Sequence, residues 1–232
     1  MSNLFNELSQ EWWKLEGAFK ALHSFNFVRV ALVNNIIKEN FKKKKGEITI
    51  LDVGCGGGIF CEPLARIGYN VMGIDTSHSS IKIAKEHCKN SNLEITYHNA
   101  DVSTLDPKKK FDLITCMEVL EHTSDPKKII KNIRMRLKPN GYFVGSTINK
   151  TILSYLFAIK IAEDFLNLIP KGTHDWKSFI RPNSLKKMLM FNGLLKFKSY
   201  GVSYNPIINS WKFQKNCNVN YMFSATLENK QN

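Results

Sequence analysis

Residues 51–59 read Leu-Asp-Val-Gly-Cys-Gly-Gly-Gly-Ile, and this stretch decides the fold of the chain. The apolar run at 48–53 is typical of a buried strand, and residues 59–67 have the pattern of a helix. Glycines stand between the two, where the backbone can approach a ligand closely because no Cβ intervenes. The stretch therefore predicts a strand, a ligand-binding turn and a helix in succession.

The spacing of these glycines separates two classes of ligand. The dinucleotide-binding pattern G-x-G-x-x-G, counted from Gly54, requires glycine where this sequence has Ile59. The pattern present is G-x-G-x-G preceded by Asp52, and it resembles the first motif of class I methyltransferases, whose loop passes beneath the methionine part of S-adenosylmethionine. The resemblance implies that Asp52, Gly54, Gly56 and Gly58 bind this cofactor.

A second acid, Asp75, follows the strand expected at 70–74, about 20 residues beyond the loop. An acid at this place in related folds accepts hydrogen bonds from ribose hydroxyls. Each feature alone has a structural explanation, since an acid after a strand often caps the next helix. Their order within one βαβ unit predicts cofactor binding.

Asp101 follows the third expected strand. Methyltransferases of this class often have a polar side chain there that faces the adenine amino group of the cofactor. The alternative is that Asp101 is a solvated acid in a loop.

Strands and helices alternate along the chain. We expect strands at 48–53, 70–74, 93–98, 111–117 and 142–146, helices at 59–67, 79–90 and 126–137, and a turn at 138–141. This alternation predicts an α/β fold, a doubly wound, mostly parallel, Rossmann-like sheet. The expected organisation is one domain over 1–232, with a helical N-terminal extension (1–46), a cofactor-binding core (47–149), an amphipathic insertion (150–180) and the C-terminal part of the sheet (181–232).

Composition narrows the class of protein. The 232 residues, 43% of them apolar, suit one globular domain, and five cysteines without a C-x-x-C pair predict free thiols in a reducing compartment. The N-terminus lacks the pattern of a secretory or transit peptide, and charges interrupt each apolar stretch before the ~20 residues of a membrane span. A net charge of +13 favours nucleic acid or anionic lipid as partners, although lysine runs often serve only solubility.

A cluster of candidate catalytic residues follows the fourth expected strand. Residues 117–122 read Met-Glu-Val-Leu-Glu-His, so Glu118, Glu121 and His122 share one face if the segment is helical. Two carboxylates and an imidazole can bind Mg²⁺, Mn²⁺ or Zn²⁺, and the oxygen-rich set favours the harder ions. Alternatively, His122 acts as a base or only packs, because Leu-Glu-His also occurs in metal-free methyltransferases of this fold.

Further segments resemble one family, the ubiquinone-biosynthesis O-methyltransferases, nearly from end to end. They are Trp12-Trp13 with Glu16-Gly17-x-Phe19-Lys20-x-Leu22-His23, the loop from Leu51 to Ile59, Thr115-Cys116-Met117-Glu118-Val119-Leu120-Glu121-His122, Pro170-Lys171-Gly172-Thr173-His174-Asp175, Tyr204-Asn205-Pro206-Ile207 and Val219-Asn220-Tyr221-Met222. The loop is common to many methyltransferases, whereas the flanking segments are not general features of the fold. One departure is Phe27, where the family commonly has Asn-Pro before the stretch that contains Arg29.

The resemblance implies both site residues and a reaction. The implied cofactor contacts are Arg29, Gly54, Asp75 and Met117, and the implied divalent-metal ligands are Glu118, Glu121 and His122. The implied substrates are 2-polyprenyl-6-hydroxyphenol and 3-demethylubiquinol. A metal, expected to be Mg²⁺, would take both adjacent ring oxygens and lower the phenol pKa from ~10.

Residues 152–169 form an apolar segment whose polar members recur at helical spacing, which predicts an amphipathic helix. The helix either packs over the active site or lies on the bilayer that holds the polyprenyl substrate, where the +13 charge would assist on anionic lipid. The expected location is cytoplasmic and peripheral to a bacterial inner membrane, or the matrix side of a mitochondrial one.

Two other classes of function compete with this interpretation. A nucleic-acid methyltransferase would suit the charge, but the sequence has no Asn-Pro-Pro-aromatic motif after the fourth strand, no Pro-Cys nucleophile and no basic domain interleaved with aromatics, so we expect no nucleic-acid partner. A non-enzymatic scaffold within a ubiquinone-biosynthesis complex is the second. The presence of Gly54, Asp75 and Glu121 favours an active enzyme.

Overall fold

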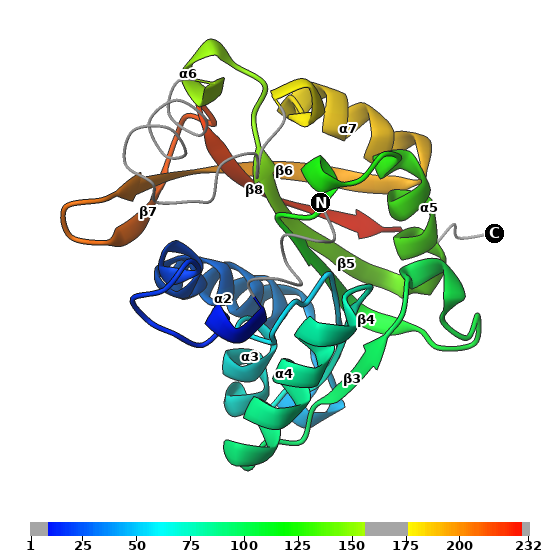
Figure 1. Cartoon of the computed structure of the whole chain (residues 1–232). Helices are drawn as coiled ribbons and strands as arrows, with labels where there is room; N and C mark the ends of the chain where they lie inside the picture. Colours follow the sequence, from blue (N-terminus) through cyan, green and yellow to red (C-terminus); the bar gives the residue numbers. More distant parts are fainter. Residues whose placement is uncertain (1–8, 156–175, 229–232) are drawn as a thin grey trace. The chain divides into compact units, whose positions relative to one another are not determined.

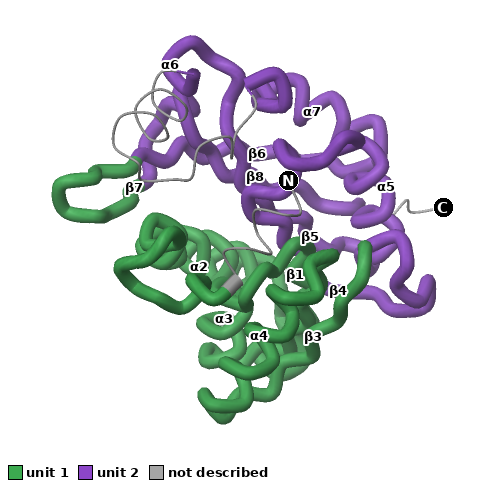
Figure 2. Tube along the Cα trace, viewed as in Figure 1, with its two compact units in different colours: residues 1–101, 204–212 green, residues 102–203, 213–232 purple. Residues whose placement is uncertain are grey.

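The computed structural model describes residues 9–155 and 176–228 of the 232 in the chain (Figure 1). The chain folds into two compact units (Figure 2). The first contains residues 1–101 and 204–212, and the second contains residues 102–203 and 213–232. The prediction of a single domain stays a prediction.

The first unit contains the parallel strands that precede and follow the glycine loop. Its strand order is β3-β2-β1, with Thr49 opposite Asn70 and Met72 opposite Thr96. The elements are η1 (Ser9–Glu11), α2 (Lys20–Asn40), η2 (Lys45–Glu47), β1 (Thr49–Val53), α3 (Cys61–Ile67), β2 (Asn70–Asp75), α4 (His78–Asn90) and β3 (Thr96–Asn99). The βαβ order predicted around the loop is confirmed.

Local residues explain where these elements begin. Ser77 caps α4, its hydroxyl accepting a hydrogen bond from the Ser80 amide at 3.2 Å. The helix α3 begins at Cys61, two residues later than predicted, because residues 56–60 still form turns. Phe27, the departure from the family pattern, lies inside the continuous helix α2 and is 81% exposed.

The second unit combines one parallel pairing with two antiparallel ones. Its strand order is β4-β5-β8-β6, parallel between β4 and β5 and antiparallel elsewhere. The elements are η3 (Val102–Thr104), β4 (Phe111–Met117), η4 (Leu120–His122), α5 (Pro126–Arg136), β5 (Leu137–Ile148), α6 (Ile152–Ser154), η6 (Trp176–Ser178), α7 (Pro182–Phe191), β6 (Leu194–Asn205), β7 (Ser210–Gln214) and β8 (Asn220–Leu227), of which β6 and β7 have residues in both units.

The strand β5 begins five residues before its predicted start. Leu137 pairs with Phe111 and Tyr142 pairs with Leu113, so β5 advances five residues where β4 advances two. The extra residues are those predicted as a turn, and Asn140 among them has φ 59°. The turn residues thus bulge out of a continuous strand rather than precede it.

Apolar side chains fill the core of each unit. In the first unit Leu51, Leu64 and Ile74 are at most 1% exposed. In the second, the rings of Phe143 and Phe223 pack edge to face with centroids 5.1 Å apart. Full burial of one such side chain stabilises the fold by about 1.5–3 kcal/mol.

Other predictions concern thiols and membrane contact. The five cysteines all lie in the described ranges and are free, as predicted. Within those ranges, no helix has the length and apolar character to cross a bilayer. The amphipathic helix predicted at 152–169 lies outside the described residues except for its first four, and so does the segment that contains His174.

Candidate functional site

The glycine loop follows β1 in the first unit, and its backbone requires glycine. Gly54, Gly56 and Gly58 have φ values of 74°, 53° and 85°, in the left-handed region that other residues rarely adopt. The amides of Gly54 and Cys55 donate to the carbonyl of Ile74 at 2.8 and 3.0 Å. The loop is therefore fixed to the carboxyl end of β2.

Asp75 ends β2 and holds the same loop through its side chain. Its Oδ2 accepts a hydrogen bond from the Gly56 amide at 2.8 Å, and its Oδ1 accepts one from the Ser77 amide at 2.8 Å. Burial raises the pKa of Asp75, while the hydrogen bonds from Ser77, Gly56 and Thr76 oppose that rise. The structure thus brings Asp75 and the glycine loop together.

Two aromatic side chains that the sequence did not place at the site contact the loop. A Cβ on Gly56 would lie 2.4 Å from Cη2 of Trp12, and a Cβ on Gly58 would lie 2.5 Å from the hydroxyl of Tyr97. Glycine is needed at these positions for the packing of the chain itself. The signal in the sequence is the tryptophan pair in a polar N-terminal segment, because rings of that size need a surface on which to bury.

The other predicted cofactor residues of the first unit have different surroundings. Asp52 is 2% exposed and accepts a hydrogen bond from Sγ of Cys61 at 3.3 Å. Arg29 is 4% exposed on α2, with its guanidinium 4.6 Å from the centroid of the Phe25 ring. Asp101 is exposed beyond the end of β3.

The second unit holds the remaining predicted residues at the end of β4. Met117, its last residue, accepts a hydrogen bond from the Ser146 hydroxyl at 3.4 Å. The amide of Glu118 donates to the Ser146 carbonyl at 3.1 Å, and the φ of Glu118 is 52°. A non-glycine residue in this conformation costs roughly 1–3 kcal/mol, so the chain turns here against a local preference.

Glu121 and His122 lie in the short 3-10 helix η4, which begins only at Leu120. The three candidate side chains therefore do not share one face of an α-helix, because the left-handed turn at Glu118 precedes the helical residues. Glu121 is 2% exposed, and its Oε2 accepts a hydrogen bond from the Thr147 hydroxyl at 2.8 Å. Within the described ranges, no three His, Cys, Asp or Glu side chains are grouped so that they could hold a metal ion.

Comparisons with known sequences place the chain among methyltransferases. A family described as a methyltransferase domain matches residues 22–195. The chain is similar to the ubiquinone biosynthesis O-methyltransferase of Pelagibacter ubique, with 41% identity over 223 residues that cover 94% of this chain and 93% of that protein. The protein of the same name from Coxiella burnetii is 40% identical over 225 residues, which cover 97% and 94% of the two chains.

Solved structures show the same fold at lower identity. A possible histamine N-methyltransferase from Thermotoga maritima superposes with a TM-score of 0.67 at 16% identity, covering 98% of this chain and 100% of that one. Magnesium protoporphyrin IX methyltransferase from Synechocystis with bound SAH gives 0.62 at 18% identity, covering 88% and 83%. Together with the family match, these likenesses confirm the predicted class I methyltransferase fold.

Thr147→Val should destabilise the protein by about 1–3 kcal/mol, because it removes a charge-assisted hydrogen bond to the buried carboxylate of Glu121. The measurement is urea unfolding followed by circular dichroism. Thr147→Ser keeps the hydroxyl and serves as the control, with a smaller loss expected. Equal losses in the two variants would show that this hydrogen bond does not stabilise the fold.

Proposed function

The chain belongs to the ubiquinone biosynthesis O-methyltransferase family, and on this basis we propose that it transfers a methyl group from S-adenosylmethionine to a phenolic hydroxyl of a polyprenylated ring. The observation that carries the proposal is the 41% identity across nearly the whole length of a relative with that name. The proposed substrates are 2-polyprenyl-6-hydroxyphenol and 3-demethylubiquinol. No comparison favours a nucleic-acid methyltransferase or a scaffold.

The first unit supplies the residues proposed to bind the cofactor. The two oxygens of Asp75 are oriented by the amides of Gly56 and Ser77, each at 2.8 Å. A carboxylate oxygen has a further lone pair, so each can also accept a hydrogen bond from a ribose hydroxyl. Gly54 and Gly58 would pass beneath the methionine part, and the proposed further contacts are Arg29, Asp52, Asp101 and Met117.

The reaction requires a phenolate that attacks the sulfonium methyl group. A bond forms between the phenolic oxygen and the methyl carbon as the carbon–sulfur bond breaks, and S-adenosylhomocysteine is the second product. The phenolic proton must leave, and a free phenol has a pKa of about 10, so a neighbouring group has to favour its loss near neutral pH. We assign that task to Glu118, Glu121 and His122 after β4.

We further propose that these three residues bind a divalent cation, expected to be Mg²⁺. The support is the chemistry of the donors and the fixed orientation of Glu121 by Thr147, since ligating carboxylates are commonly held by a second hydrogen bond. A bound cation would supply Lewis acidity that lowers the pKa of the phenol. The described residues do not group the three side chains, so the site would need further ligands or a rearrangement to form.

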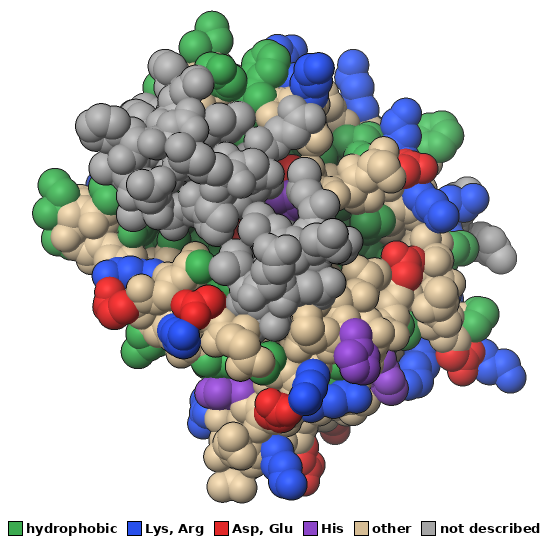
Figure 3. All heavy atoms as spheres, viewed as in Figure 1, with side chains coloured by type: hydrophobic (Ala, Val, Ile, Leu, Met, Phe, Trp, Pro, Cys, Tyr) green, Lys and Arg blue, Asp and Glu red, His purple; other side chains and the backbone are tan. Residues whose placement is uncertain are grey.

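A peripheral contact with an anionic membrane is the third part of the proposal. The connection between β6 and β7 exposes Ile207 by 91% and Ile208 by 68%. Hydrophobic atoms stand at the left edge of Figure 3, where this connection lies in Figure 1. Its base is held by Trp211, whose indole donates to the Ala21 carbonyl at 3.1 Å and stacks on Phe25 with centroids 4.2 Å apart. A connection that is held at its base and exposes two isoleucines is suited to insertion among lipid headgroups.

Charge and the predicted helix at 152–169 add to this support. A net charge of +13 would attract anionic lipid. Where that helix begins, in the second unit, Ile152 is 78% exposed and Leu153 is 40% exposed. We infer that the protein works at the surface of the membrane that holds its substrate, the inner membrane in a bacterium.

The purified chain should transfer a labelled methyl group from S-adenosylmethionine to a short-chain demethylubiquinol, and EDTA should abolish most of this activity until Mg²⁺ is restored. Glu121→Gln should lower the rate about 10-fold or more, since lost metal-site groups commonly cost that much. The exposed Glu94→Gln is the control. Absence of transfer would refute the proposed function, whereas full activity in EDTA would refute only the metal.

Asp75→Asn should weaken binding of S-adenosylhomocysteine by about 10-fold or more, because charge-assisted hydrogen bonds contribute about 1.5–3 kcal/mol each. Ribose hydroxyls donate best to the ionised carboxylate. The affinity for S-adenosylhomocysteine should therefore be highest above the pKa of Asp75 and fall as the pH drops through that pKa. Burial raises that pKa, so the loss should begin above the ordinary value of about 3.9. Calorimetry from pH 8 down to the lowest pH at which the chain stays folded measures this. The exposed Asp106→Asn is the control, and unchanged affinity in Asp75→Asn would remove Asp75 from the site.

Ile207→Asp with Ile208→Asp should reduce binding to vesicles of phosphatidylglycerol and phosphatidylcholine, because each exposed isoleucine contributes about 1.5–3 kcal/mol when buried in lipid. Flotation measures bound protein. Phe191→Asp is a matched control, since Phe191 is 92% exposed at the end of α7 in the second unit. The proposed contact would be contradicted if the control lost as much vesicle binding as the double variant, or if the parent chain did not bind the vesicles.

A further inference from the structure

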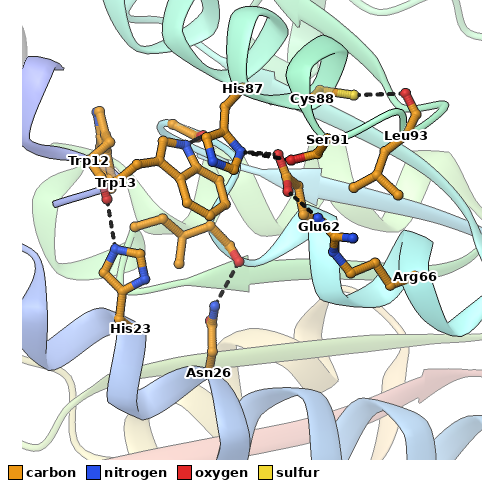
Figure 4. Close-up of polar contacts among 12 residues, drawn as sticks. Trp12, Trp13, His23, Asn26, Glu62, Arg66, His87, Cys88, Ser91 and Leu93 are labelled. Carbon is orange, nitrogen blue, oxygen red and sulfur yellow. Dashed lines mark hydrogen bonds and ion pairs between the residues drawn. The ribbon is translucent and has the colours of Figure 1, made fainter. Parts of the chain in front are cut away.

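We propose that Trp12 and Trp13 are positioning residues for the cofactor, whose indoles hold the glycine loop and Asp75 in the conformation that binds S-adenosylmethionine. The inference rests on the proposed function, because it assigns a role toward the cofactor of that reaction. The inference adds two residues of the N-terminal segment to those proposed to act in cofactor binding. This segment lies outside the motifs of the α/β core. Figure 4 shows Trp13 beside His87 and Glu62, and His23 at the carbonyl of Trp12.

The ring of Trp12 lies directly on the glycine loop. A Cβ on Gly56 would lie 2.4 Å from its Cη2, and a Cβ on Gly57 would lie 2.4 Å from its Cγ, so the indole extends across both residues. The indole also stacks on Phe19, with ring centroids 3.9 Å apart and planes 2° from parallel. Trp12 is only 7% exposed and forms a buried cluster with Phe19 and Ile59, the residue that ends the loop. The loop backbone therefore has a rigid aromatic surface against it.

The indole N–H of Trp12 extends this contact to the acid of the site. It donates to the hydroxyl of Ser80 at 3.2 Å in the first turn of α4. The amide of Ser80 donates to the hydroxyl of Ser77, and the amide of Ser77 donates to Oδ1 of Asp75 at 2.8 Å. The other oxygen of Asp75 accepts from Gly56, on which the ring lies. Trp12 thus touches both ends of the arrangement that orients the carboxylate.

Trp13 holds the next residue of the loop by a separate route. Its indole N–H donates to the carbonyl of Gly57 at 2.9 Å. Its ring stacks on His87 of α4, with centroids 3.4 Å apart and planes 4° from parallel. His87 in turn donates to Glu62 of α3 at 2.6 Å, and Glu62 is 2% exposed. Trp13 therefore ties the loop to the two helices that flank it.

The segment that carries the tryptophans is itself fixed to α2. Nε2 of His23 donates to the carbonyl of Trp12 at 2.8 Å, and the amide group of Asn26 donates to the carbonyl of Ile59 at 2.6 Å. Both contacts are drawn in Figure 4. His23 therefore holds the tryptophan segment and Asn26 holds the end of the loop, from positions one turn apart on α2. A loop held in this way has less conformational freedom to lose when a ligand binds.

The test is calorimetric titration of S-adenosylhomocysteine into the full chain and into Trp12→Phe and Trp13→Phe. Phenylalanine keeps an aromatic ring but removes the indole donor. Each variant should bind roughly 2- to 10-fold more weakly, the range expected for one lost hydrogen bond. In the methyl-transfer assay, KM for S-adenosylmethionine should rise by the same factor while kcat at saturation stays within about twofold.

Trp176→Phe is the matched control, since Trp176 also donates to a backbone carbonyl, that of Thr151 at 3.0 Å, and packs edge to face on the Tyr155 ring, but in the second unit rather than on the loop. It should unfold at a similarly lowered temperature and keep the parent affinity. A second variant, Ser80→Ala, removes the acceptor of the Trp12 indole and should weaken binding without any change of tryptophan.

The outcomes separate the two proposals. If the parent does not bind S-adenosylhomocysteine, the proposed function fails. If the parent binds it and Trp13→Phe and Ser80→Ala bind equally well, the tryptophans only pack and the inference is overturned. Weaker binding in Trp176→Phe to the same extent would also overturn it, because general destabilisation would then explain the effect.

Discussion

The proposed cofactor region depends on the hydrogen bonds that the carboxylate of Asp75 accepts from the backbone on either side of it. Because β1 and β2 are parallel neighbours, the loop after β1 meets the carboxyl end of β2, where Ile74 accepts hydrogen bonds from the loop. Asp75 then accepts one amide from Gly56 in the loop and another from Ser77 before α4. A buried carboxylate is costly unless such charge-assisted bonds compensate it. The left-handed glycines, the cap of α4 and the acid therefore depend on one another.

The second unit also contains a buried carboxylate that is held by a hydrogen bond, shortly after the end of β4. Glu121 is buried and accepts a hydrogen bond from Thr147 on β5, while the turn before it places Glu118 in a left-handed conformation. In each unit the carboxylate is oriented by hydrogen-bond donors from other segments of the same unit. Groups held in this way need little reorganisation when charge changes nearby, and this suits them to catalysis and ligand binding.

Parts of the chain outside the alternating α/β pattern carry further features of the proposed sites. The tryptophan pair lies on the glycine loop, and Trp211 holds the connection that exposes Ile207 and Ile208. Both depend on aromatic rings that bury against α2 or against residues beside it. A common scaffold thus acquires its particular surfaces from peripheral segments, in agreement with the principle that function resides in sites added to a fold.

The sequence by itself determined the order of strands and helices around the loop, the class of the fold and the family, because apolar periodicity, glycine spacing and acids at strand ends are local patterns. Even the residues of the bulge in β5 stood out as turn-formers, although their place inside a strand did not. Only the tertiary structure decided that Trp12 and Tyr97 occupy the space beside Gly56 and Gly58. It also decided that Glu118 does not share one helical face with Glu121 and His122. The physical reason is distance along the chain: Trp12 and Gly56 are 44 residues apart, so their contact exists only after α2, β1 and the loop have packed together.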